Sequence, residues 1–225
     1  MRMRILFAGH TPLDDSPTGR AWRTALERLR TAGHDVRALV VDGDPQNPER
    51  PHVRRVVCHG DAKGAPLRFT APSFYTNGSG GLNFADLSDR QLSEYRDVLR
   101  IEFDREIDLH DPHIVHTQQL WLFAHLALEA GVPYTVSAHG DEFAVGRNDM
   151  RYKRFMIQAA ENAGRILTHS DVAHSGVTEL VGELEGRVRR FPTVDADDPA
   201  VANWHTALPA LYRETFVERF GREPK

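Results

Sequence analysis

Cysteine is nearly absent from this chain of 225 residues, because Cys58 is its only example. A single cysteine excludes an internal disulfide, so the fold needs no oxidising compartment. Long hydrophobic runs are also lacking. The first apolar run, Ile5–Ala8, is too short for the core of a signal peptide or for a membrane span. We therefore expect a cytoplasmic protein without a membrane span.

An excess of positive charge is missing as well. The 28 lysines and arginines are outnumbered by 32 aspartates and glutamates, which gives a formal net charge of -4. Nucleic-acid binding demands a basic surface that neutralises phosphates, so we expect no nucleic-acid partner. The composition is otherwise that of a globular protein, with 40% hydrophobic and 27% charged residues. A chain of this length can bury roughly two thirds of its surface in a core.

Short apolar runs alternate with helical periods along most of the chain. The runs are typical of buried parallel strands and lie at Arg4–Ala8, Val36–Val41, Arg54–Cys58, Ile114–His116, Tyr134–Ala138, Arg165–Thr168 and Arg187–Phe191. Helices are expected over Ala21–Ala32, from Ser88 to Pro112, and over Leu120–Ala130, Arg151–Ala163 and Val172–Val181. The pattern predicts an α/β fold with a single Rossmann-like, doubly wound, mainly parallel sheet of about seven strands.

The predicted sheet accounts for residues 1–197, which leaves no room for a second Rossmann domain. Within it, Asp61–Asp86 is polar and glycine-rich and is expected to form an irregular insertion. Residues 198–225 form a tail in which Pro209 suits the first position of a helix, and apolar residues up to Phe220 fall on one helical face. We expect this C-terminal helix to pack back on the domain.

Ligands of open α/β sheets bind outside the carboxyl ends of the strands, so the loops after strands hold the candidate site residues. The first loop runs from Gly9 into a helix whose N-terminus favours an anion. Gly19 in this loop permits close approach of a phosphate or a sugar, and Arg20 follows it. The alternative is a turn with an ordinary helix cap, since the loop contains no GxGxxG motif.

The second loop contains His116, Gln118 and Trp121. Sugars are commonly held by amide and hydroxyl hydrogen bonds together with an aromatic platform, and this loop offers groups of both kinds. The loop therefore indicates a sugar-binding surface. The alternative is that Trp121 belongs to the core.

The third loop places His139, Asp141 and Glu142 just past a central strand. A histidine there can orient or polarise a substrate hydroxyl, and the carboxylates can bind a hydroxyl or assist a proton transfer. A capping role for Asp141 is the alternative. The pair His139 and Asp141 also leaves open a small hydrolase or a nucleotide-binding enzyme, although no nucleophile motif accompanies it.

A metal site formed by His110, His113 and His116 is not expected. Pro112 prevents a shared helix, and two strand residues three positions apart face opposite sides of a sheet. We therefore predict no metal ligands.

Five segments in the expected order resemble the N-terminal domain of family 4 glycosyltransferases of the GT-B fold. They are the opening strand with the Gly19 loop and the turn Leu26–Val36, then Asp111–His116, Gly131–Asp141, Ala163–Ser170 and Arg187–Asp195. The resemblance covers about residues 3–197.

The resemblance implies that the Gly19 loop faces the donor phosphates or sugar, and that His139 contacts the transferred sugar. The region of His116 and Trp121 would line the acceptor side. In that family a second Rossmann domain, with an E-x7-E motif and basic residues, holds the nucleotide diphosphate, and this sequence has no counterpart of it. Trp204–Phe220 resembles the C-terminal helix that crosses back onto the N-terminal domain. The chain thus resembles an acceptor-side half from which the donor domain has been removed.

The function implied by this resemblance is a retaining glycosyl transfer in which an oxygen of the donor diphosphate helps to deprotonate the acceptor hydroxyl. A nucleotide sugar is then a co-substrate, and no cofactor or metal is required. The expected partners are a separate donor-domain protein or a second copy of this chain, and a small sugar acceptor. The alternative is a non-catalytic, degenerate domain that binds a sugar or metabolite or regulates another enzyme.

Overall fold

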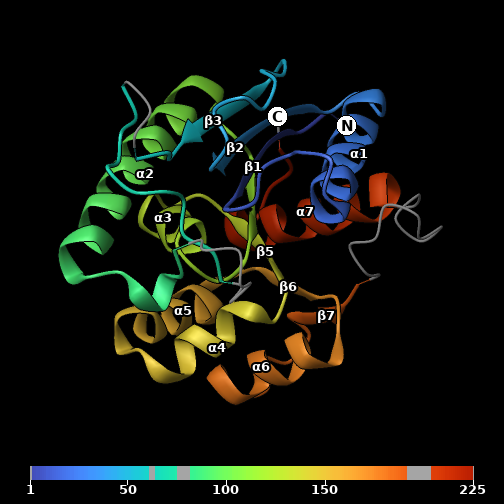
Figure 1. Cartoon of the computed structure of the whole chain (residues 1–225). Helices are drawn as coiled ribbons and strands as arrows, with labels where there is room; N and C mark the ends of the chain where they lie inside the picture. Colours follow the sequence, from blue (N-terminus) through green and yellow to red (C-terminus); the bar gives the residue numbers. More distant parts are fainter. Residues whose placement is uncertain (1, 61–63, 75–81, 192–203, 225) are drawn as a thin grey trace.

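The computed structural model describes residues 2–60, 64–74, 82–191 and 204–224. Its centre is a seven-stranded sheet in which every neighbouring pair of strands is parallel (Figure 1). The order across the sheet is β3-β2-β1-β4-β5-β6-β7. The strands are β1 (Arg4–Gly9), β2 (Asp35–Asp42), β3 (Val53–Val57), β4 (Ile114–Gln118), β5 (Tyr134–Ala138), β6 (Arg165–Thr168) and β7 (Val188–Arg190). The predicted Rossmann-like fold is confirmed, with strand ends that differ from the expected ones by one or two residues.

Helices cover both faces of the sheet (Figure 1). They are α1 (Pro17–Thr31), α2 (Asp89–His110), α3 (Phe123–Glu129), α4 (Asp141–Asn148), α5 (Met150–Asn162), α6 (Asp171–Val181) and α7 (Trp204–Phe220), with a 3-10 turn at Phe84–Asp86. None of the described helices is long and apolar enough to cross a membrane.

Two apolar clusters fill the space between the sheet and its helices. Ile5 and Phe7 of β1 point to the face that α1 and α7 cover, whereas Leu6 and Ala8 point to the face that α2, α3 and α5 cover. This alternation follows from the period of two along a strand, and both faces are apolar because parallel sheets are buried on both sides. The sheet is thereby held as a rigid platform for the loops at its carboxyl edge.

Side-chain caps fix the starts of the two longest helices of the first half. Ser16 accepts a hydrogen bond from the backbone N–H of Gly19, so α1 begins at Pro17, four residues before the predicted Ala21. At α2, Ser88 accepts from the N–H of Gln91 at 3.3 Å, and Gln91 accepts from the N–H of Ser88 at 3.0 Å. This reciprocal capping box satisfies donors that have no partner within the helix.

Helix α4 is a feature that the sequence reading missed, because the stretch between β5 and Arg151 was predicted to be a loop. The helix follows directly on Gly140, whose φ of 114° permits an abrupt turn out of the strand. Phe143 of α4 packs against Gly176 of α6 so closely that a Cβ on Gly176 would lie 2.6 Å from Cγ of the Phe143 ring. Tertiary packing therefore stabilises a segment whose own apolar pattern is short. The predicted helix over Leu120–Ala130 is also shorter than expected, since α3 begins only at Phe123.

Helix α7 packs on α1 and β5, as predicted for the C-terminal helix (Figure 1). Pro209 lies inside α7 and not at its first position, so that prediction was wrong. Proline removes one backbone hydrogen-bond donor from a helix. The buried side chains of Leu208, Leu211 and Tyr212, on either side of Pro209, pack on the domain and stabilise α7 at this position. The predicted boundary between residues 197 and 198 lies outside the described residues, as do parts of the insertion expected over 61–86.

Candidate functional site

The order of the strands reverses between β1 and β4. The chain runs outward from β1 to β2 and β3 and then returns to place β4 on the other side of β1. Open α/β sheets bind ligands in the crevice outside the carboxyl ends of the strands at such a reversal. The residues that follow β1, β4 and β5 therefore define the candidate site.

A cavity of about 240 Å³ opens next to this reversal. Its walls come from the loop after β1, the residue after β4, and two segments beside β2 and the insertion: His10, Thr11, Pro12, Val41, Gly43, Ala71, Pro72, Ser73, Phe74 and Gln119. Gln119 is 4% exposed, and within the described part of the chain its side-chain oxygen has no hydrogen-bond partner. A buried acceptor without a partner is uncommon, and a ligand or a water molecule that donates to it removes the cost.

His10 and Gln119 were not among the residues selected from the sequence. Each directly follows a strand, so a survey of the first residue after every strand would have included both. Gln119 also has a backbone φ of 65°, a left-handed conformation that no sequence pattern here predicts. This conformation turns the chain sharply away from β4, while the Gln119 N–H donates to the carbonyl oxygen of Ser137 at 2.8 Å.

The His10 ring is held on both sides. Its Nδ1 lies 2.8 Å from the Tyr95 hydroxyl oxygen, and its Nε2 lies 2.9 Å from the carbonyl oxygen of Trp121. Burial lowers the pKa of His10 to about 3, against a smaller opposing effect of the Trp121 carbonyl. The ring is therefore neutral near pH 7 and forms a fixed wall of the cavity.

Gln118 and His116 both point into the protein. A Cβ on Gly9 would lie 2.9 Å from Cδ of Gln118, which shows that the Gln118 side chain crosses the end of β1. Nε2 of His116 lies 2.9 Å from the Ser137 hydroxyl oxygen, and Nδ1 is hydrogen-bonded to the Tyr212 hydroxyl of α7. The polar groups of His116 are thus occupied within the fold, and His116 acts as a link between β4, β5 and α7.

His139 is the first residue after β5 and is only partly buried. Its backbone N–H and that of Gly140 donate to the two carboxyl oxygens of Glu142, at 3.3 and 2.8 Å. Glu142 is fully buried, and burial raises its pKa to about 7 although the backbone hydrogen bonds oppose the rise. The carboxyl group of Glu142 therefore holds the turn that presents His139.

The imidazole of His139 lies beside that of His169, the first residue after β6. The ring centroids are 5.4 Å apart and the planes are tilted by 33°. Burial, and to a smaller degree the neighbouring His169, lowers the pKa of His139 to about 3. Its Nε2 is buried and finds no hydrogen-bond partner among the residues that the structure covers. His139 therefore offers a neutral ring with a nitrogen available to a ligand.

The first loop is more closed than the sequence indicated. Gly19 lies in the first turn of α1, and a Cβ there would lie 2.8 Å from the backbone N and O of Asp14. Asp14 in turn accepts hydrogen bonds from the N–H and the hydroxyl of Ser16. Arg20 donates to the carbonyl oxygen of Asp15 at 2.5 Å. The glycine is needed for this close packing of the loop on the helix start.

Trp121 and Asp141 are placed differently from the other candidates. Trp121 is fully buried and packs edge to face on Tyr152, with ring centroids 4.8 Å apart, so it exposes no platform in this structure. Asp141 is half-buried in the first turn of α4. Glu142, and not Asp141, accepts the backbone hydrogen bonds at the start of that helix.

A family model for the glycosyl transferase 4-like domain matches residues 18–194. The match covers most of the chain and includes Gly19, His116 and His139. The chain belongs to the glycosyl transferase 4-like family. No sequence among the curated proteins matches it.

Solved structures share the fold of this glycosyl transferase 4-like domain. Sucrose-phosphate synthase from Thermosynechococcus elongatus in the form 27_220_406_426 has a TM-score of 0.55 and 16% identity, over 96% of this chain and 99% of that chain. The longer chain of the same enzyme has a TM-score of 0.53 and 16% identity, over 84% of this chain and 48% of its own. UDP-GlcNAc 2-epimerase from Methanocaldococcus jannaschii has a TM-score of 0.51 and 9% identity, over 84% and 45%. The chain thus spans about half the length of the last two proteins.

The glycosyl transferase 4-like domain carries no cluster suited to a metal in the part that the structure describes, where no three His, Cys, Asp or Glu side chains group together. His110, His113 and His116 accordingly do not converge. Two buried polar atoms near the carboxyl edge lack a hydrogen-bond partner among the described residues, the amide oxygen of Gln119 and Nε2 of His139. They follow adjacent strands, β4 and β5, and mark the part of the domain best suited to contact a substrate.

Proposed function

We propose that this domain forms the acceptor side of a retaining, nucleotide-sugar-dependent glycosyl transfer, and that a separate polypeptide binds the donor nucleotide. The observation that carries the proposal is Nε2 of His139, a buried nitrogen without a hydrogen-bond partner among the described residues, at the end of β5 and beside the strand whose end borders the cavity. Membership of the glycosyl transferase 4-like family supports the reaction class.

His139 is proposed to contact a hydroxyl of the transferred sugar. A neutral imidazole can donate or accept a hydrogen bond according to its tautomer, and the lowered pKa keeps the ring neutral over the physiological range. Glu142 is proposed to position His139, since both of its carboxyl oxygens are bound to the backbone of the turn and neither is free for substrate. A fixed contact of this kind costs no reorganisation when the reaction occurs.

The cavity beside the strand reversal is the proposed acceptor site. The amide oxygen of Gln119 would accept a hydrogen bond from an acceptor hydroxyl, while Phe74 and Pro72 supply an apolar wall. Gly19 and Arg20 lie in the first turn of α1, and they are proposed to face the donor once a donor-binding partner is in place. Trp121 contributes to the cavity indirectly, because its backbone carbonyl is hydrogen-bonded to His10 of the cavity wall.

The proposed reaction breaks the bond between the anomeric carbon and the diphosphate oxygen of the donor and forms a bond from that carbon to the acceptor oxygen. The proton of the acceptor hydroxyl passes to an oxygen of the departing diphosphate. No electrons are exchanged with an oxidant or reductant, so no redox cofactor is needed. The domain would contribute mainly the orientation of the acceptor hydroxyl.

The proposed separate donor-binding polypeptide, or second copy of the chain, would supply the second Rossmann domain that holds the nucleotide diphosphate in the family that the sequence resembles. Two of the neighbouring structures are about twice as long as the region they share with this chain. The shorter sucrose-phosphate synthase form matches nearly end to end, including the region of α7 within its coverage of 96%.

The test uses the tagged chain isolated with its associated proteins from its own cells, assayed with radiolabelled UDP-glucose, UDP-N-acetylglucosamine and GDP-mannose against an extract of small sugars. His139→Asn removes the imidazole, and His52→Asn makes the same change at an exposed position. We expect His139→Asn to lose at least tenfold in transfer and His52→Asn to lose none. Unchanged transfer by His139→Asn would contradict catalysis at this edge and favour a binding module. Efficient transfer by the recombinant chain alone would contradict the separate donor partner.

A further inference from the structure

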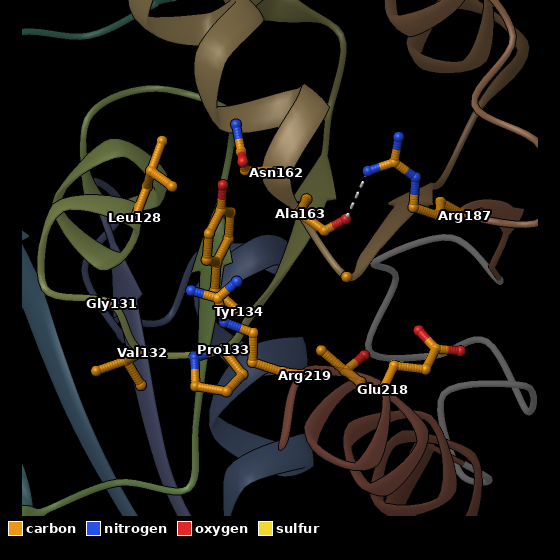
Figure 2. A pocket seen from close by; sticks show the side chains of 12 residues that line it. Leu128, Gly131, Val132, Pro133, Tyr134, Asn162, Ala163, Arg187, Glu218 and Arg219 are labelled. Carbon is orange, nitrogen blue, oxygen red and sulfur yellow. Dashed lines mark hydrogen bonds between the residues drawn. The ribbon is translucent and has the colours of Figure 1, made fainter. Parts of the chain in front are cut away.

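A second cavity, of about 230 Å³, lies at the opposite edge of the sheet, where β5 and β6 begin. Figure 2 shows Tyr134 and Pro133 at its centre, with Arg219 of α7 on one side and Arg187 beyond Ala163 on the other. The walls include Leu128, Val132, Tyr134, Arg187, Thr215 and Arg219. The proposed transfer takes place at the carboxyl edge and does not use this cavity.

The residues that line the cavity include two arginines and one glutamate, so the lining carries a net positive charge. Arg219 is exposed, and no described residue forms a hydrogen bond or ion pair with its guanidinium. Arg187 donates only to backbone oxygens, those of Glu161 at 2.6 Å and Ala163 at 3.4 Å (Figure 2). Glu218 is the one acidic residue of the lining, and both of its oxygens are bound by Arg165 at 2.5 and 2.6 Å. Two guanidinium groups are therefore left to meet an anion.

A buried hydroxyl at the wall is a second and independent indication of a ligand. Thr215 of α7 is 3% exposed, and its Oγ1 lacks a hydrogen-bond partner among the described residues. The hydroxyl lies close to the backbone of Gly164, where a Cβ would come within 3.1 Å of it. A hydroxyl buried against apolar groups alone loses its hydrogen bonds to water and gains none in exchange, which destabilises the folded chain.

The rest of the lining is apolar or aromatic. Leu128, Val132 and Pro133 form one wall, and the Tyr134 ring stands beside them with its hydroxyl donating to the carbonyl oxygen of Ala159 at 2.7 Å. Burial raises the pKa of Tyr134, and the positive charges of Arg187 and Arg219 oppose that rise. Arg187, Arg219 and the Tyr134 ring thus line the same cavity.

We propose that this cavity binds a small organic anion, a phosphate monoester or a carboxylate that carries a non-polar group. Arg219 and Arg187 attract the oxyanion, the Thr215 hydroxyl donates to it, and the wall around Tyr134 receives the non-polar part. Thr215 and Arg219 belong to α7, whereas Tyr134 and Arg187 flank strands of the sheet. A bound anion therefore fastens α7 to the sheet and stabilises the folded chain.

The test measures binding to the full chain by calorimetry and by the shift in melting temperature. The probes are phenyl phosphate and benzoate, with phenol and inorganic phosphate as probes that each lack one of the two required parts. Arg219→Gln removes the exposed charge and Thr215→Val removes the hydroxyl at nearly constant shape. Arg222→Gln, an exposed arginine just past α7 and outside the lining, is the matched control.

We expect saturable binding of phenyl phosphate, benzoate or both, weakened at least tenfold in Arg219→Gln and severalfold in Thr215→Val, and unchanged in Arg222→Gln. Preference between the two anions identifies phosphate or carboxylate as the natural group. Absence of saturable binding of both, or equal affinity in Arg219→Gln and Arg222→Gln, would overturn the proposal. Inorganic phosphate binding as tightly as phenyl phosphate would overturn the assignment of the non-polar wall. Because no transfer is measured, these outcomes are independent of the proposed function.

Discussion

His116 of β4 and Tyr212 of α7 are hydrogen-bonded through Nδ1 and the phenol hydroxyl, across 96 residues of sequence. Both side chains are almost completely buried, and their rings meet edge to face with centroids 5.5 Å apart. The second nitrogen of His116 bonds to Ser137, so this one imidazole joins α7 to two central strands. The attachment of the C-terminal helix thus depends on a polar contact inside an apolar layer.

Tyr212→Phe removes the hydroxyl and keeps the ring. The buried Nδ1 of His116 then has no partner, and we expect the free energy of unfolding in urea to fall by about 1 to 3 kcal/mol. Tyr134→Phe is the matched control. Its hydroxyl donates to the carbonyl oxygen of Ala159 in the last turn of α5, so its removal leaves only that backbone carbonyl without a donor, and we expect a smaller loss of stability. Equal stability of Tyr212→Phe and the wild type would show that the hydrogen bond does not hold α7.

Acid should destabilise the fold through its buried histidines. Burial lowers the pKa of His10, His116 and His139 from the usual 6.5 to about 3. Below about pH 6.5 the unfolded chain binds protons at these positions while the folded chain does not, so stability falls as the pH falls. Each histidine contributes about 1.4 kcal/mol per pH unit over that range.

Glu142 opposes this trend, because burial raises its pKa from 4.5 to about 7. The folded chain takes up this proton first, so Glu142 adds stability as the pH falls from about 7 to 4.5. Three histidines against one glutamate leave a net loss of about 2 to 3 kcal/mol per pH unit between about pH 6 and 4.5. Urea midpoints across this range measure it, and His139→Asn should reduce the slope by about 1 kcal/mol per pH unit. A flat profile would contradict neutral burial of these rings.

Glu142→Gln should loosen the turn that presents His139. Two backbone N–H groups donate to the carboxyl oxygens, and a glutamine offers one oxygen and sets its amide N–H groups against the other donor. We expect a loss of about 1 to 3 kcal/mol in the free energy of unfolding. Asp141→Asn, next in the chain and half-buried, should change it by less than about 0.5 kcal/mol. Similar effects of the two substitutions would contradict the assignment of the turn to Glu142.

Gly19→Ala should destabilise the start of α1. The new Cβ would lie 2.8 Å from the backbone N and O of Asp14, closer than real Cβ contacts allow. We expect a loss of about 1 to 3 kcal/mol, measured by thermal or urea unfolding. Asp14→Ala in the same chain should not restore stability, since it leaves those backbone atoms in place. Full rescue by Asp14→Ala would mean that the Asp14 side chain alone forbids a larger residue.

The carboxyl-edge site was only partly predictable. The end of β5 just before His139 was foreseen, because an apolar run ending in polar residues locates the end of a strand, whereas β4 runs two residues past its predicted end at His116, to Gln118. That the imidazole of His139 is open while that of His116 is not depends on Tyr212, which arrives from the far end of the chain. Gln119 and the cavity it lines were missed, since an isolated glutamine carries no pattern.

The sequence by itself determined the seven strands and their order along the chain, the long helix that starts at Ser88 and the presence of a C-terminal helix. These features follow from local periods of two and 3.6 and from caps within a few residues. Only the tertiary structure decided the helix after Gly140, the closure of the Gly19 loop by Asp14 and the cavity between Tyr134 and Arg219. Each depends on which distant segments pack together, and that is set by long-range contacts that a local pattern does not encode.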